Sequence, residues 1–130
     1  MDRQRIASGS PFEPVIGFSR AYRAGGQVFV SGTAPVADDG GVFAPGDMHA
    51  QTRRCFEIAL RALAEVGGSV TDVVRTRVFL VDGSRWEEAA QAHGELFADV
   101  RPAGTFVVVA GLLDPGWLVE VEVDAVLEAD

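Results

Sequence analysis

The alternation of hydrophobic and polar positions predicts a β-strand near the end of the chain, at residues 118–126. Val119, Val121 and Val123 fall on one side of an extended backbone, and the acidic residues between and after them fall on the other. We therefore expect one face of this strand to be buried and the other to be charged. Further strands are expected where β-branched and aromatic residues gather, at 17–24, 27–33, 71–81 and 105–110.

A helical period predicts a long helix over about 47–66. Asp47 is suited to cap its first turn, and the pair Gly67-Gly68 would end it. One face of this helix is expected to pack on the sheet, because its apolar or small residues recur at helical spacing. This stripe comprises Thr52, Cys55, Phe56, Ala59, Leu63 and Val66.

A second helix is predicted over about 84–97. Ser84 and Glu87 have the spacing of a capping box, which would open the helix. The face expected to be buried comprises Trp86, Ala89, Ala90, His93 and Leu96. His93 is accordingly interpreted as a residue beside the core.

The predicted elements follow the order β-β-α-β-α-β-β, an α+β arrangement with two helices on one face of a sheet. We expect Gly25-Gly26 to make a hairpin turn and 37–46 to form a loop or short hairpin. The first ten residues are expected to lie along the surface, with Pro11 and Pro14 in extended backbone. Residues 1–130 are expected to form one domain, and the uncovered sheet face favours an oligomer.

Charge excludes two classes of partner. The formal net charge is −8, and every basic residue other than histidine is an arginine. An acidic chain of this kind is not expected to bind nucleic acid or anionic membrane, since both require an excess of cations. No apolar run approaches the length of a membrane span, and the first ten residues lack a signal-peptide pattern, so we expect a cytoplasmic protein.

Metal and cofactor sites are not indicated. His49 and His93 lie far apart in sequence, and neither belongs to a metal-ligand motif. Cys55 falls on the apolar helix stripe, where a buried, inert thiol is expected. The glycine pairs lack the lysine of a phosphate-binding loop, so we expect no metal and no cofactor.

Three acidic residues share the polar face of the last strand: Glu120, Glu122 and Asp124. Arg75 and Arg77 likewise share one face of an earlier strand. One interpretation is a cross-strand network of arginines and carboxylates. The other places a carboxylate in a cleft, where it holds a water molecule or acts as a general acid or base.

Two segments could bring backbone amides to a small anion. Ser31, Gly32 and Thr33 lie at a predicted strand end, where the glycine allows close approach. Gly104 and Thr105 follow Arg101-Pro-Ala103 at the start of another strand.

These segments carry a resemblance to the Rid family, also called YjgF or L-PSP endoribonuclease-like. Five stretches resemble that family in order: Ser19–Thr33, Gln51–Glu57, Asp72–Leu80, Arg101–Ala103 and Leu118–Glu122. The resemblance implies a chorismate-mutase-like, mostly antiparallel fold and a homotrimer with clefts between subunits. In the best-known branch it also implies hydrolysis of 2-imino or enamine acids, with an arginine after Pro-Ala on the substrate carboxylate and a glutamate on the attacking water.

The chain resembles a branch that lacks this arginine, because Gly104 occupies its position and Glu120 that of the glutamate. Phe18 stands for the N-terminal aromatic residue, Ala90 for a frequent asparagine, and His93 for an aromatic residue. Another arginine could replace the missing one, and the candidates are Arg20, Arg77 and Arg101. The predicted catalytic residue is Glu120, and the predicted ligand-binding residues are Phe18, Ser31, Gly32, Thr33, Arg77, Gly104, Thr105 and Trp117.

Two functions remain open from the sequence. The first is an enzyme acting on a small imine or enamine at the subunit interface. The second is a non-catalytic ligand-binding or regulatory trimer that uses the same cleft, which the absence of the arginine favours. Ribonuclease activity is disfavoured by the net charge of −8 and the absence of lysine.

Overall fold

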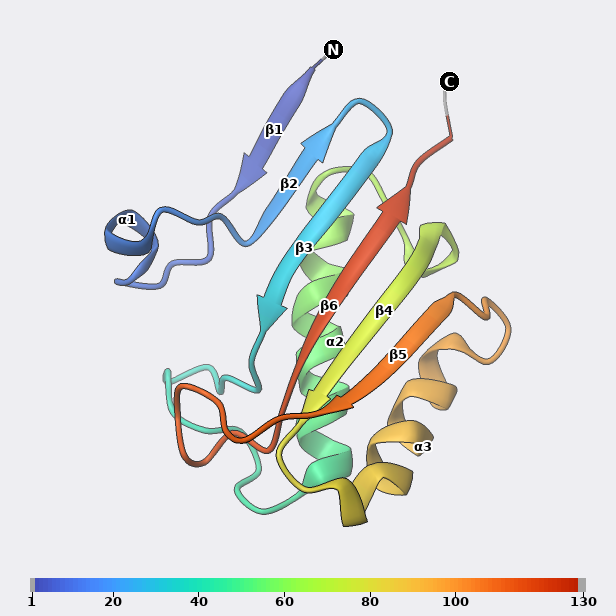
Figure 1. The fold of residues 1–130 in the computed structure, drawn as a ribbon. Helices are drawn as coiled ribbons and strands as arrows, with labels where there is room; N and C mark the ends of the chain where they lie inside the picture. The colour runs from blue at the N-terminus through green and yellow to red at the C-terminus, as the bar shows by residue number, and fades with distance from the viewer. Residues whose placement is uncertain (1, 129–130) are drawn as a thin grey trace.

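A six-stranded sheet carries two long helices on one face in the computed structural model of the chain, which describes residues 2–128 (Figure 1). The strand order is β1-β2-β3-β6-β4-β5, and every pair is antiparallel except β4 with β5. The predicted α+β class with a mostly antiparallel sheet is confirmed. The strands are β1 (Arg3–Ile6), β2 (Ala21–Ala24), β3 (Gln27–Thr33), β4 (Val73–Leu80), β5 (Ala103–Val108) and β6 (Val119–Val126).

The two long helices are α2 (Met48–Glu65) and α3 (Trp86–Phe97). Asp47 caps α2 as predicted, because its side chain accepts a hydrogen bond from the amide of Ala50 at 2.9 Å. Gly67 follows the helix with a φ of 93°, a conformation that glycine adopts without strain. The minor helices are α1 (Glu13–Ile16) and the 3-10 turns η1 (Val70–Asp72) and η2 (Gly83–Arg85).

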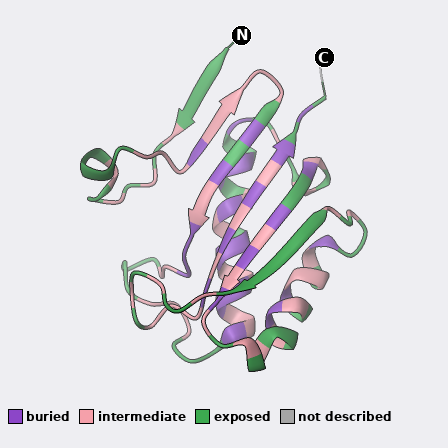
Figure 2. Cartoon of the chain, viewed as in Figure 1, coloured by how far each residue is buried: buried purple, intermediate pink, exposed green. Residues whose placement is uncertain are grey.

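The core lies between α2 and the sheet. Burial alternates along β3, β4 and β6, and Figure 2 shows this as a change of colour from residue to residue. The valines of β6 predicted to be buried are all buried, as is the whole predicted stripe of α2. Phe56 lies at the centre, with its ring edge-on to Phe97 at a centroid distance of 5.1 Å.

The N-terminal segment differs from the prediction. Residues Arg3–Ile6 lie on the surface as predicted, but they form an exposed edge strand, β1, paired with β2, that was not predicted. Pro14 lies in the first turn of α1 and not in extended backbone, because proline fits a helix start where amides have no partner. Gly17 ends α1 with a φ of 84°, so β2 begins only at Ala21 instead of residue 17.

The start of α3 also differs from the prediction. Asp82 accepts hydrogen bonds from both the amide and the hydroxyl of Ser84, so Ser84 belongs to η2 and forms no capping box with Glu87. The helix therefore begins at Trp86, whose side chain is 54% exposed instead of buried. Ala92 takes a place in the core that the sequence did not predict.

Neither long helix in residues 2–128 combines the length and the apolar character that a bilayer crossing would need.

We expect Phe56→Ala to destabilise the protein by about 3–5 kcal/mol, because it leaves a cavity beneath the sheet. Leu113→Ala is the control, since Leu113 is 90% exposed and its loss should change stability by less than about 0.5 kcal/mol. Chemical denaturation measures both. Equal midpoints for the two variants would contradict the assignment of Phe56 to the core.

Candidate functional site

Glu120 lies near the start of β6, on the sheet face that no helix covers. A Cβ atom at residue 32 would lie only 2.7 Å from Oε1 of Glu120, so the carboxyl group rests against the backbone of Gly32. The pairing of β3 with β6 is irregular between Val30 and Thr33, and this bulge brings Gly32 under the carboxyl group. The sequence predicted that Gly32 would let a ligand approach the backbone; in the structure the group that approaches it is the carboxyl group of Glu120.

Arg20, which precedes β2, holds the same bulge from the other side. Its Nη2 donates to the carbonyl oxygens of Ser31, at 3.0 Å, and of Gly32. The amide of Ser31 donates in turn to the carbonyl oxygen of Arg20 at 3.0 Å. Backbone and side chain therefore both attach the start of β2 to the end of β3.

Burial and the nearby Arg20 set the electrostatic environment of Glu120. Burial raises the pKa of Glu120 above its ordinary value, and the positive charge of Arg20 opposes that rise. Burial likewise lowers the pKa of Arg20, while the charge of Glu120 opposes the fall. No ion pair within 4.0 Å joins these two side chains, so the opposite charges face the Gly32 region without neutralising each other in a direct contact.

The hydroxyl groups of Ser31 and Thr33, two of the three predicted at the site, hydrogen-bond within the bulge itself. Ser31 Oγ donates to the carbonyl oxygen of Ser19 at 2.6 Å. Thr33 Oγ1 donates to the carbonyl oxygen of Ser31 at 2.8 Å, and Thr33 is fully buried. Both hydroxyl groups are therefore already engaged in the single chain. The backbone of Gly32 is the part of this segment that remains to contact a ligand.

A groove of about 500 Å³ adjoins the bulge on the open sheet face. Phe18, Ser31 and Arg77 all line it, so three of the predicted ligand-binding residues come together. Nη1 of Arg77 lies 3.4 Å from Glu122 and 3.5 Å from Asp124, which is the cross-strand network considered in the sequence analysis. These contacts are long and partly exposed, so they restrain Arg77 only weakly.

The remaining predicted site residues lie elsewhere in the single chain. Gly104 is opposite Thr76 and Thr105 opposite Arg77, both on β5 at the edge of the sheet. Trp117 lines a separate hollow with residues of the 110–115 loop. One chain therefore does not gather Gly104, Thr105 and Trp117 around Glu120.

His93 has the core-side position predicted for it. Its Nε2 lies 2.8 Å from the hydroxyl of the buried Thr76, and burial lowers the pKa of the imidazole. Its ring packs among Phe56, Phe97 and Phe106. These contacts describe a neutral histidine that joins α3 to β4.

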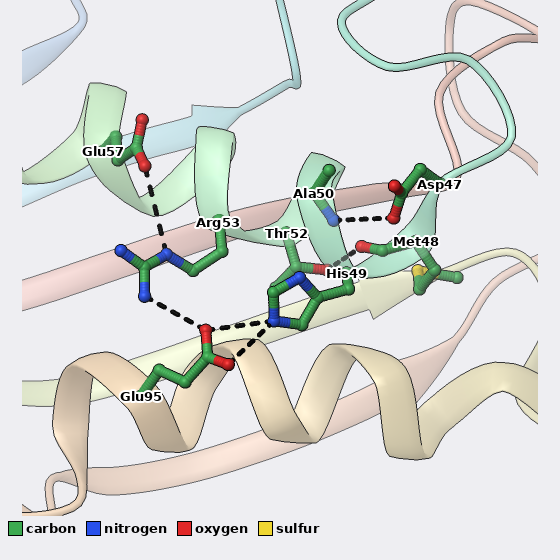
Figure 3. Close-up of polar contacts among 8 residues, drawn as sticks. All are labelled: Asp47, Met48, His49, Ala50, Thr52, Arg53, Glu57 and Glu95. Atoms are coloured by element: carbon green, nitrogen blue, oxygen red, sulfur yellow. Dashed lines mark hydrogen bonds and ion pairs between the residues drawn. The ribbon is translucent and has the colours of Figure 1, made fainter.

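His49 belongs to an exposed cluster instead. Figure 3 shows His49 and Arg53 of α2 directed toward Glu95 of α3, at 3.0 and 3.1 Å. This cluster ties the two helices together on the outer surface. Across residues 2–128, no group of three or more histidine, cysteine or acidic side chains is arranged to hold a metal ion.

From the sequence, Arg20 is only one of three arginines that could replace the missing one. In the structure the charge of Glu120 acts on it. A signal was available, because a hairpin turn at Gly25-Gly26 sets Arg20 across from Ser31. Arg101, another of the three, is exposed at the start of the β5 segment.

Comparisons with known proteins identify the family of the chain. The family described as Endoribonuclease L-PSP matches residues 9–127. The uncharacterised protein SCO2049 of Streptomyces coelicolor is 43% identical over 122 residues, covering 94% of this chain and 90% of that protein. The 3-aminoacrylate deaminase RutC of Acinetobacter baylyi is 34% identical over 116 residues, covering 89% and 90%.

Solved structures give the same result. Rv2704 of Mycobacterium tuberculosis, described as a member of the YjgF/YER057c/UK114 family, superposes with a TM-score of 0.87 at 40% identity. The match covers 97% of this chain and 100% of that one. Together with the matched family and the helix-covered antiparallel sheet, it confirms the resemblance stated from the sequence: the chain belongs to the endoribonuclease L-PSP family, also known as the YjgF or Rid family.

Proposed function

We propose that the protein hydrolyses a small imine or enamine, with Glu120 holding and deprotonating the attacking water. The observation that carries this proposal is the half-buried carboxyl group seated on Gly32, where burial raises its pKa toward the range useful for general acid–base catalysis. The pKa values of Glu13, Asp82, Glu88 and Glu95 are instead lowered, chiefly by hydrogen bonds from neighbouring side chains.

The reaction balances with water as the only co-reactant. An enamine first tautomerises to the imine, and the oxygen of water then bonds to the imine carbon while Glu120 takes one proton. Glu120 returns this proton to the nitrogen, which gives the neutral carbinolamine. Glu120 then takes the hydroxyl proton as the C=O bond forms and delivers it to the nitrogen as the C–N bond breaks. The carbonyl product and ammonia leave, and the carboxylate is restored.

The relative RutC supports the reaction class, since its name states that it is a 3-aminoacrylate deaminase. We therefore propose 3-aminoacrylate, together with 2-aminoacrylate, as the first substrates to test. The transfer of this reaction class from RutC to the present chain rests on 34% identity over 89% of the chain's length.

We further propose that the active assembly is a homotrimer, whose neighbouring subunit brings Gly104 and Thr105 to the cleft. The open sheet face and the edge strand β5 support this, because β5 is exposed along its whole length and includes Phe106, Val107 and Val108. Uncovered apolar edge strands tend to pair with another chain.

Sedimentation equilibrium tests this assembly. The expected mass is about three times the 13.8 kDa of one chain, because a ring of three head-to-tail contacts leaves no edge strand uncovered. A concentration-independent mass of one chain would contradict it.

A second function is favoured by Gly104. A glycine there supplies no guanidinium, so the cleft could bind a ligand without turning it over as a non-catalytic or regulatory trimer. Gly104→Arg distinguishes the two: if Glu120 and its water are competent, the variant should gain imine hydrolysis of at least about tenfold through an added carboxylate contact. A variant that folds, binds 2-aminoacrylate and still shows no turnover would favour the non-catalytic alternative.

Glu120→Gln is expected to lower the rate of ammonia release by at least about 100-fold, since the amide cannot accept a proton. The variant should unfold at an equal or higher temperature at pH 7. A raised folded-state pKa means that the carboxyl group stabilises the fold at low pH and loses this contribution as pH rises through that pKa. The amide avoids the loss.

Gly32→Ala is a second variant that tests the role of Glu120, because the added methyl group would displace the carboxyl group of Glu120. We expect a similar loss of rate with the glutamate intact. Glu65→Gln, an exposed change at the end of α2, is the control for charge removal. A Glu120→Gln variant that releases ammonia as fast as the control would refute the role of Glu120.

A further inference from the structure

Arg20 is a partly buried cation without an anionic partner. Nη2 is occupied by two backbone carbonyl oxygens, but Nε is sealed from solvent and has no hydrogen-bond partner. Nε of Arg20 is the only buried side-chain nitrogen or oxygen left unpaired among residues 2–128. Buried charges are normally paired, so a partly buried guanidinium without a carboxylate partner can take an external anion at whichever of its ends solvent reaches.

The groups around Arg20 do not supply that partner. No carboxylate of residues 2–128 lies within 4.0 Å of it. Glu13 is engaged by the amide and hydroxyl of Ser8. Burial raises the pKa of the Cys55 thiol well above its ordinary value, so this group is neutral. Glu120 is the remaining charge that acts on Arg20.

One end of the guanidinium remains available to a ligand. Nη1 makes no hydrogen bond with the described chain, and unlike Nε it is not sealed from solvent. It lies on the same side chain that holds the Ser31 and Gly32 carbonyl groups, next to the backbone on which Glu120 rests. The charge of Glu120 acts on Arg20, so an anion bound at Nη1 would lie within the electrostatic reach of the Glu120 carboxyl group.

We propose that Arg20 binds the carboxylate of a small ligand whose reactive carbon lies toward Glu120. This inference rests on the proposed function, because it takes Glu120 as the reacting end of the same site. Guanidinium groups bind carboxylates through charge-assisted hydrogen bonds, which also orient the ligand. Recognition of the carboxylate would then fall to Arg20, just before β2. It would not need an arginine at the position of Gly104.

The two charges make binding and protonation interdependent. A carboxylate near Arg20 disfavours a second negative charge on Glu120, so binding should raise the pKa of Glu120 further. By linkage, the ligand should bind more tightly as pH falls through that pKa. The ligand's own carboxyl group stays ionised above about pH 5, which leaves a window for the measurement.

The test uses the full chain labelled with ¹⁵N, with acetate as the anionic probe and acetamide as its neutral counterpart, at constant ionic strength. We expect acetate to shift the amide signals of Ser31 and Gly32 and the Nε–H signal of Arg20 in a saturable way. Acetamide should leave them unchanged. Binding to Arg20→Gln should be at least tenfold weaker, and binding to Arg20→Lys intermediate, while Arg61→Gln on the exposed face of α2 should match the unaltered protein.

Three outcomes would overturn the proposal: no saturable shift with acetate, equal shifts with acetamide, or unchanged affinity in Arg20→Gln. If Arg20→Gln fails to fold, the Arg20 Nε–H signal of the unaltered protein decides, because acetate must move it. The result is separable from turnover. Acetate binding without imine hydrolysis would leave Arg20 as a carboxylate site and refute the proposed reaction. Imine hydrolysis without acetate binding would support the reaction and refute the role of Arg20.

Discussion

The contact between the carboxyl group of Glu120 and the backbone of Gly32 is the constraint on which the candidate site depends. A side chain at residue 32 would occupy the space of Oε1, so the position of the carboxyl group requires a glycine. The glycine reaches it through the bulge in β3, and Arg20 holds the two carbonyl oxygens of that bulge. We therefore expect the loss of Gly32, of the bulge or of Arg20 to change both the burial and the protonation of Glu120.

The fold places this arrangement on the two central strands of the sheet, β3 and β6. Helices α2 and α3 cover one sheet face, so the acidic side of β6 is left on the open face with Arg77 and the groove. The other predicted ligand-binding residues lie on β5 and in the turn at Trp117, away from Glu120 in the same chain. An assembly in which neighbouring chains complete each other's clefts would reconcile the two sets, and it would also cover the apolar edge of β5.

Strong periodicity made most of the fold predictable. The valines of β6 and the stripe of α2 repeat over many residues, so a local exception cannot change the face that they bury. The failures lie where short polar contacts override the pattern: Asp82 captures Ser84 and delays α3, and Gly17 ends a helix that shortens β2. In the candidate site, Glu120 and Gly32 were identifiable from sequence, but the partnerless state of Arg20 depends on tertiary burial that no spacing encodes.

A direct measurement of the Glu120 pKa tests the central claim, that a half-buried carboxyl group on Gly32 is held ready to exchange a proton. The side-chain carboxyl carbon of Glu120 can be followed by NMR as pH varies, with its signal assigned from Glu120→Gln. We predict a midpoint above the ordinary value of 4.5, because burial outweighs the charge of Arg20. A midpoint at or below 4.5 would contradict this, since Glu120 would then be an ordinary solvated carboxylate.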